Sequence, residues 1–209
     1  MSISELVHNA GPLIYPLAAC SLLACLIAIE RFLALRRSRV LPPEIIEVVQ
    51  AVRPDRDLAI AIDVCRRNPG VFADVMRVGL EQSGGPWDLV RDALVDAGRQ
   101  KVPALQSHLV WLQSIAQAAP LIGLLGTVLG MMKMFASISF SGLGDPQALS
   151  GGISEAMITT AIGLAIGIPT LVAYNALSAK SETLIGEIEG HASRLLAQLR
   201  GETTPGDAR

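Results

Sequence analysis

The sequence predicts an all-α fold: a polytopic membrane protein with three transmembrane helices, the second and third extended into the cytoplasm, plus short cytoplasmic helices. Its 209 residues are 51% hydrophobic, with a mean hydropathy of +0.46. The charged residues concentrate at 30–101 and 180–209 and leave three almost uncharged blocks, at 10–29, 109–140 and 146–179. About 20 helical residues, at ~1.5 Å each, cross a ~30 Å hydrocarbon core. Each block is therefore long enough to span a membrane.

The first block, AGPLIYPLAACSLLACLIAI, contains no charged residue. The basic residues that flank it all follow it, and they are Arg31, Arg36, Arg37 and Arg39. The positive-inside rule then places the amino terminus outside, the 40–108 segment inside, the 139–152 loop outside and the carboxyl terminus inside. A cleavable signal peptide has its positive charges before its apolar region. We therefore expect 1–39 to be an N-out anchor.

The 40–108 segment is predicted to fold into short amphipathic helices. Apolar residues recur at helical spacing in LPPEIIEVVQAV, DLAIAIDVCRR and VFADVMRVGLEQ, and breaks rich in proline and glycine separate these stretches. Pro86 suits the start of a longer helix, which we expect to run through 87–108 into the second span with a kink at Pro103. The second and third predicted spans follow at 109–179. An amphipathic cytoplasmic helix and a disordered tail, GETTPGDAR, follow at 180–209.

The residues that build common catalytic and metal sites are sparse and scattered. The cysteines are odd in number and lie in two predicted compartments, at Cys20, Cys25 and Cys65, which does not favour a disulfide framework. The histidines are His8, His108 and His191. With no metal-ligand spacing, no phosphate-binding glycine loop and no nucleic-acid patch, we expect no metal, no cofactor, no nucleic-acid partner and no enzyme activity. The arginines after the first span are interpreted as topology determinants and contacts to lipid headgroups.

Small residues mark one face of each of the last two spans. Gly123, Thr127 and Gly130 fall at i, i+4 and i+7 in the second span. The third span repeats the pattern with Ala156, Thr160, Gly163 and Gly167, and Gly126 adds to the packing positions. Such faces let helix backbones approach, and a threonine hydroxyl on one can bond across the contact. The alternative is a packing seam in which each hydroxyl bonds to its own helix. Pro120 and Pro169 are predicted kinks.

A single carboxylate interrupts the third apolar block, Glu155 in ISEAMITTAIGLAIGI. A carboxylate within a span points to a water-filled cavity or a polar partner. The alternative is a position near the outer interface, where headgroups wet it. Thr159 lies one turn beyond, close to the same face. Lys133, toward the outer end of the second span, is expected to snorkel.

Two stretches carry a resemblance: AAPLIGLLGTVLGMMKMF at 118–135 and GISEAMITTAIGLAIGIPTLVAYN at 152–175. Their Ala-Pro, Gly-Leu-Leu-Gly-Thr-Val, Glu-Ala, Thr-Ala-Ile-Gly-Leu, Ile-Pro and Tyr-Asn elements resemble, in order and spacing, the ExbB/TolQ/MotA family of energy-transducing bacterial inner-membrane proteins, and within it the ExbB and TolQ branches. The Glu30-Arg31-Phe32 ending of the first span fits as well. Motor stators of the MotA type have four spans, so three spans disfavour a stator.

The resemblance implies a function and partners. Similar proteins form a ring, a pentamer in ExbB-like complexes, around a single-span partner similar to ExbD or TolR that supplies a proton-carrying aspartate. Thr127 and Thr160 would line the proton path, with Glu155 as the ionisable position and Thr159 as a further lining residue. The expected role is ExbB-like, powering TonB-dependent transport across the outer membrane. The alternatives are a TolQ-like subunit of the Tol-Pal envelope system, acting with a TolA-like protein, and a non-conducting membrane scaffold.

Overall fold

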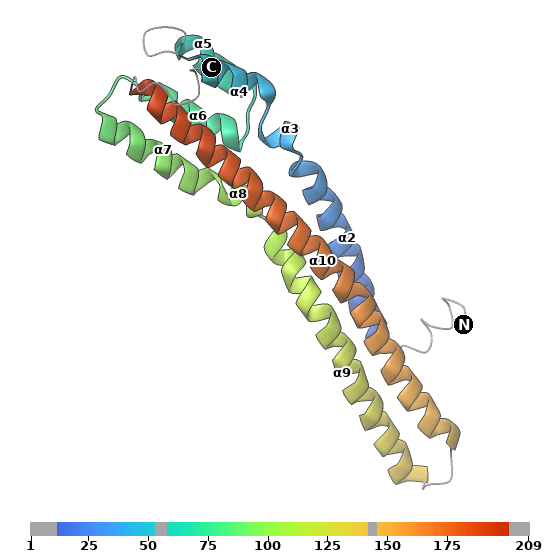
Figure 1. The fold of residues 1–209 in the computed structure, drawn as a ribbon. Coiled ribbons are helices and arrows are strands. Elements are labelled where there is room, and N and C mark those ends of the chain that lie inside the picture. The colour runs from blue at the N-terminus through green and yellow to red at the C-terminus, as the bar shows by residue number, and fades with distance from the viewer. Residues whose placement is uncertain (1–11, 53–57, 142–145, 201–209) are drawn as a thin grey trace, which may run out of the picture. The chain divides into compact units, whose positions relative to one another are not determined.

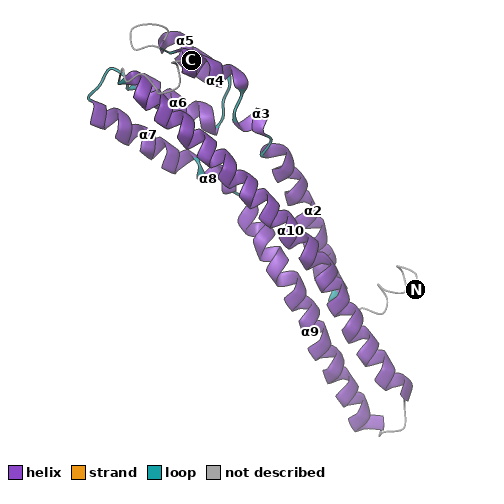
Figure 2. Cartoon of the chain, in the orientation of Figure 1, coloured by secondary structure: helices purple, strands orange, loops and turns teal. Residues whose placement is uncertain are grey.

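The computed structural model describes residues 12–52, 58–141 and 146–200, and these residues form helices and no strand (Figures 1 and 2). The helices are α2 (Ile14–Ala34), α3 (Arg37–Val40), α4 (Pro43–Ala51), α5 (Leu58–Arg67), α6 (Val71–Glu81), α7 (Trp87–Lys101), α8 (Pro103–Gln106), α9 (Leu109–Ser141) and α10 (Pro146–Leu199). Three helical stretches in this part of the chain are long and apolar enough to cross a membrane. The prediction of an all-α protein with three spans is confirmed.

The chain divides into two compact units. The first contains α2 up to Arg31, α9, and α10 up to Ala176. In this unit α2 buries only a narrow stripe, Leu17, Ala24 and Arg31, which recur every seven residues and therefore lie on one line of the helix. α9 and α10 run side by side and make backbone contact, as their glycines show below.

The second unit contains α3 to α8 and the part of α10 that begins at Leu177. Its core is built from large apolar side chains. Phe72 and Met76 of α6 are fully buried, and Ile188 and Leu195 of α10 are 1% and 0% exposed. The short helices predicted for the 40–108 segment are present as α4, α5 and α6, each with its apolar face in this core.

The continuous helix predicted over 87–108 is wrong. α7 ends at Lys101 because Pro103 has no N–H to bond the carbonyl four residues before it. The short α8 then ends at Gln106, and His108 has φ 62°, which residues other than glycine rarely adopt. The His108 carbonyl accepts from the backbone N–H groups of Trp111 and Leu112, so the helix restarts there as α9. The predicted disordered tail at 201–209 and residues 142–145, the centre of the loop predicted to lie outside, are not among the described residues.

Candidate functional site

The contact between α9 and α10 depends on glycines. A Cβ placed on Gly163 would lie 2.6 Å from the Ala119 carbonyl oxygen, and one on Gly123 would lie 3.1 Å from the Thr159 carbonyl oxygen. At Gly130 the Gly152 carbonyl oxygen would be 2.9 Å away. Since Cβ atoms essentially never come within 3 Å of another heavy atom, larger residues at Gly163 and Gly130 would force the two helices apart, and one at Gly123 would make an unusually tight contact.

The two threonines predicted to line the path bond differently. The Thr160 hydroxyl donates across the helix contact to the Gly123 carbonyl oxygen at 2.8 Å. The Thr127 hydroxyl donates to the Leu124 carbonyl oxygen of its own helix at 2.7 Å. Both side chains stay partly exposed in the isolated protomer. Thus one hydroxyl ties α10 to α9, whereas the other follows the back-bonding pattern common for threonine in membrane helices.

Thr159 lies inside the helix contact. Its side chain is 1% exposed, and its hydroxyl donates to the Glu155 carbonyl oxygen at 2.7 Å. A Cβ on Gly126 would fall 2.5 Å from the Thr159 Cγ2 atom, so the threonine fills the space that this glycine leaves. Within the protomer Thr159 therefore packs against α9.

Glu155 has a partner that the sequence analysis did not assign to it. The Lys133 Nζ atom donates to the Glu155 Oε1 atom at 2.6 Å, and the two side chains are 55% and 25% exposed. Lys133 had been expected to snorkel, whereas in the structure it pairs with the carboxylate. The sequence signal was the presence of one charge of each sign in two adjacent apolar blocks.

A cavity of about 330 Å³ adjoins this ion pair. Its polar lining consists of Lys133, Glu155 and Thr159. The remaining lining residues are apolar or glycine, and they are Pro12, Leu13, Gly126, Leu129, Met132 and Ala136. The ion pair is thus the charged part of an otherwise apolar cavity.

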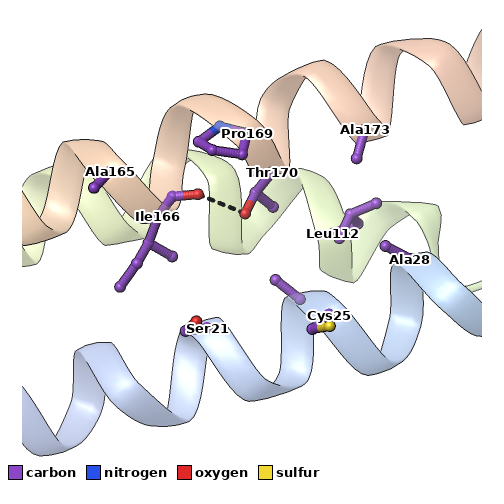
Figure 3. A pocket seen from close by; sticks show the side chains of 10 residues that line it. Ser21, Cys25, Ala28, Leu112, Ala165, Ile166, Pro169, Thr170 and Ala173 are labelled. Carbon is purple, nitrogen blue, oxygen red and sulfur yellow. Dashed lines mark hydrogen bonds between the residues drawn. The ribbon is translucent and has the colours of Figure 1, made fainter.

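A second cavity, of about 280 Å³, lies among α2, α9 and α10 of the first unit (Figure 3). Small side chains line it, among them Ser21 and Cys25 of α2. Thr170 is 7% exposed and donates to the Ile166 carbonyl oxygen at 2.7 Å, which is the dashed line in Figure 3. These residues are not among those predicted from the sequence to form a site. Pro169 lies in the same lining and inside α10, as Pro120 lies inside α9; a kink at either remains a prediction.

The headgroup contact expected of the basic residues is wrong for Arg31. This side chain is 7% exposed, and its Nε atom donates to the Glu30 Oε2 atom at 2.9 Å. Its Nη2 atom lies 2.6 Å from the His108 Nδ1 atom. Because a guanidinium has only donors, the histidine nitrogen accepts. Arg31 therefore joins the end of α2 to the residue that starts α9, and it is not a headgroup contact.

Comparison with known proteins identifies the family. The sequence profile of the MotA/TolQ/ExbB proton channel family matches residues 68–190, more than half of the chain and including most of α9 and α10. The chain belongs to this family. A MotA/TolQ/ExbB protein is a channel or transducer subunit and not an enzyme.

Relatives come from both the ExbB and the TolQ branches. The chain is 32% identical over 142 residues, 68% of its length, to the Tol-Pal system protein TolQ of Pseudomonas aeruginosa. It is 48% identical over 80 residues, 38% of its length, to the biopolymer transport protein ExbB of Helicobacter pylori. These matches span 57% and 55% of the two relatives, so the chain covers little more than half of each. An ExbB-like protein of Synechocystis is 32% identical over 79% of the chain and 80% of its own length.

The fold is shared with a solved structure. The structure of Campylobacter jejuni MotAB matches with a TM-score of 0.52, covering 97% of this chain and 88% of that one, at 16% identity. At that identity the likeness describes architecture alone. The family and the three apolar helices point to an inner-membrane protein.

Proposed function

We propose that the chain is a ring subunit of an inner-membrane complex that is driven by the proton-motive force, with an ExbB-like role in powering TonB-dependent transport. The observation that carries the proposal is that the family match covers the paired helices α9 and α10, where the glycine contacts, the threonine hydroxyls and the ion pair all occur. In this proposal the chain provides the polar wall of a proton path.

The hydrogen bonds of two threonine hydroxyls support the proposal that this wall is polar. A proton path through hydrocarbon needs polar groups, which are costly there unless they are satisfied. Thr127 and Thr160 keep their hydroxyls satisfied within the helix pair while their side chains stay partly exposed, so they can face a path without destabilising the protomer. The apolar blocks at 109–140 and 146–179 contain no aspartate. The proton-carrying acid is therefore assigned to a single-span ExbD-like partner.

A ring also explains the surface of the first unit. Large apolar side chains such as Leu121, Met132 and Met157 are 62–67% exposed in the protomer. Neighbouring copies and lipid would cover them. We expect a homo-oligomer, with five copies by analogy to ExbB-like complexes. Native mass spectrometry of the detergent-purified protein should detect a ring, and a protein that stays monomeric with and without its partner contradicts the proposal.

The orientation that this function needs has the amino terminus in the periplasm and the carboxyl terminus in the cytoplasm. In a variant without Cys20, Cys25 and Cys65, a cysteine introduced at position 145 should react with a membrane-impermeant maleimide added to intact spheroplasts. A cysteine introduced at Arg99, which is 78% exposed, should react only after lysis. The opposite labelling pattern contradicts the proposed orientation.

The ExbB-like role is supported by the 48% identity to the Helicobacter ExbB, and a TolQ-like role by the longer match to the Pseudomonas TolQ. Deletion of the gene distinguishes the two roles. If the subunit is ExbB-like, the deletion should abolish TonB-dependent uptake and leave the envelope intact. A TolQ-like subunit predicts sensitivity to detergents with uptake retained. If neither phenotype appears, and the protein with its partner moves no protons in liposomes, the energy-transducing role is refuted.

A further inference from the structure

Lys133 and Glu155 are the charged residues of their apolar blocks, and the structure brings them together. No other Asp, Glu, Lys or Arg occurs in 109–140 or 146–179. The distance of 2.6 Å between Nζ and Oε1 is that of a hydrogen bond between a charged donor and a charged acceptor. Such a bond is stronger than one between neutral groups.

We propose that Lys133 is a positioning residue, which holds Glu155 as one half of a fixed charge pair, and that Glu155 itself does not carry the transported proton. This inference rests on the proposed function. It changes the role of Glu155, because a carboxylate that bound and released the transported proton would lose its charge in every cycle. The ammonium would then have no counter-charge in either apolar block.

The surroundings of the pair support this assignment. Among the residues that the structure describes, the cavity beside it offers Thr159 as the one further polar side chain, and that hydroxyl is directed to the Glu155 backbone carbonyl. A hydroxyl bonded in this way does not replace the carboxylate as a counter-charge for Lys133. Lys133 also lies six positions after Thr127, which is ~9 Å along α9 at ~1.5 Å per residue. The two residues therefore occupy different levels of this helix.

A fixed pair and a proton carrier respond differently to the removal of both charges. Removing one member of an ion pair within an apolar span leaves a lone charge, which is costly there, whereas replacing both members by uncharged residues is often close to neutral. If the pair is fixed, a variant without both charges should work. If Glu155 transfers protons, that variant should fail as badly as one that lacks Glu155 alone.

The test uses the full chain co-purified with its partner and reconstituted in liposomes, with proton flux driven by a potassium diffusion potential. Flux is counted per assembled ring, so that a loss of assembly alone does not change it. We expect Lys133→Met and Glu155→Gln each to lower flux about tenfold or more, because each leaves a lone charge. The double variant and Lys133→Arg, which keeps the positive charge, should stay within about threefold of the wild type. Lys101→Met, which removes a lysine from an exposed ion pair with Asp74, is the matched control and should be unchanged.

A double variant as inactive as Glu155→Gln overturns the proposal, and so do single variants with full flux. A wild-type protein that shows no partner-dependent flux refutes the proposed function instead. In that case the thermal unfolding in detergent of the wild type, Lys133→Met, Glu155→Gln and the double variant decides the pairing. Strong coupling between the two substitutions supports the pair, and purely additive effects overturn it.

Discussion

The two units of the chain achieve tight packing by opposite means. In the first unit the closest contacts are made by glycine backbones, and large apolar side chains such as Leu26 and Leu121 remain more than 60% exposed. In the second unit Phe72 and Ile188 are buried, and ion pairs such as Arg37–Glu187 lie on the surface. Lipid gives helices no hydrophobic reason to associate, so close approach and polar bonds must hold them, whereas in water the burial of apolar surface suffices. α10 takes part in both units and changes its residue types between them.

The largest effect is expected where a side chain would enter the glycine contact. Gly163→Ala places a methyl group 2.6 Å from a carbonyl oxygen that belongs to the backbone of α9 and cannot move aside. We expect loss of the assembled protein, measured by size-exclusion chromatography and thermal unfolding in detergent. The matched control is Gly186→Ala in the second-unit part of α10, where nothing lies within 4 Å of the new methyl group. That variant should be stabilised by up to ~1 kcal/mol, because alanine is the better helix former. An equal loss of assembled protein in both variants would contradict the proposed difference in packing between the two units.

The next effect concerns the core of the second unit. Phe72→Ala should destabilise this unit by ~3–5 kcal/mol, since the ring is fully buried and its removal leaves a cavity. Phe135 of α9 is 63% exposed, and Phe135→Ala should change stability far less. Hydrogen exchange of the two variants should show faster exchange in α6 for the first and an unchanged pattern for the second. Faster exchange throughout α9 after Phe72→Ala would mean that the units do not unfold separately.

A smaller effect should appear on acidification. Burial lowers the pKa of His191 from its ordinary value of 6.5, and the nearby Arg194 adds to this; the ring packs edge-on against Phe72 at 5.4 Å. The unfolded chain therefore binds a proton at a higher pH than the folded one, so stability rises with pH in this range. The contribution should be complete above pH 6.5 and be lost as the pH falls through the lowered pKa. Thermal unfolding at pH 7.5 and 5.5 should show this loss in the wild type and a smaller loss in His191→Gln.

The smallest effect concerns the reactivity of a buried cysteine, and it does not change the free energy of unfolding at neutral pH. Burial raises the pKa of Cys65 from 9.0 to about 11, so the thiolate fraction at pH 8 should be ~100-fold below that of an ordinary thiol. In a Cys20→Ala/Cys25→Ala background, iodoacetamide should react with the folded protein at least that much more slowly than with the denatured protein. Mass spectrometry of the time course measures both rates. Equal rates would show that the core around Cys65 opens freely.

The spans and the small-residue faces could be predicted from the sequence because both depend on local periodicity. Hydropathy identified the three helices, and spacing identified Gly123 and Gly163. The Lys133–Glu155 and Arg31–His108 contacts could not be assigned, since they join residues 22 and 77 positions apart and depend on the register of packed helices. Pro103 indicated a distortion of the long helix, but no feature of the sequence predicted the positive φ of His108.

The threonines show where sequence reasoning had to leave two answers open. A threonine in a helix can bond its own helix or the neighbouring one, and only the position against the facing helix decides. Thr127 bonds within α9, whereas Thr160 reaches the Gly123 carbonyl oxygen because glycine brings that backbone close. The residue type allows either hydrogen bond, and the packing of α9 against α10 determines which one forms.

The most direct test of the proposed proton path is the flux per assembled ring of Thr160→Val, measured with the co-purified partner in liposomes. Valine keeps the shape of threonine and removes the hydroxyl, so the ring should assemble while flux falls, because the proposed path loses a polar group that it needs within the hydrocarbon region. The matched control is Thr183→Val, which removes an exposed hydroxyl that bonds the Ala179 carbonyl oxygen at 3.0 Å in the second unit, and it should conduct normally. A Thr160→Val ring that assembles and conducts like the wild type contradicts the account and leaves the helix pair as a scaffold.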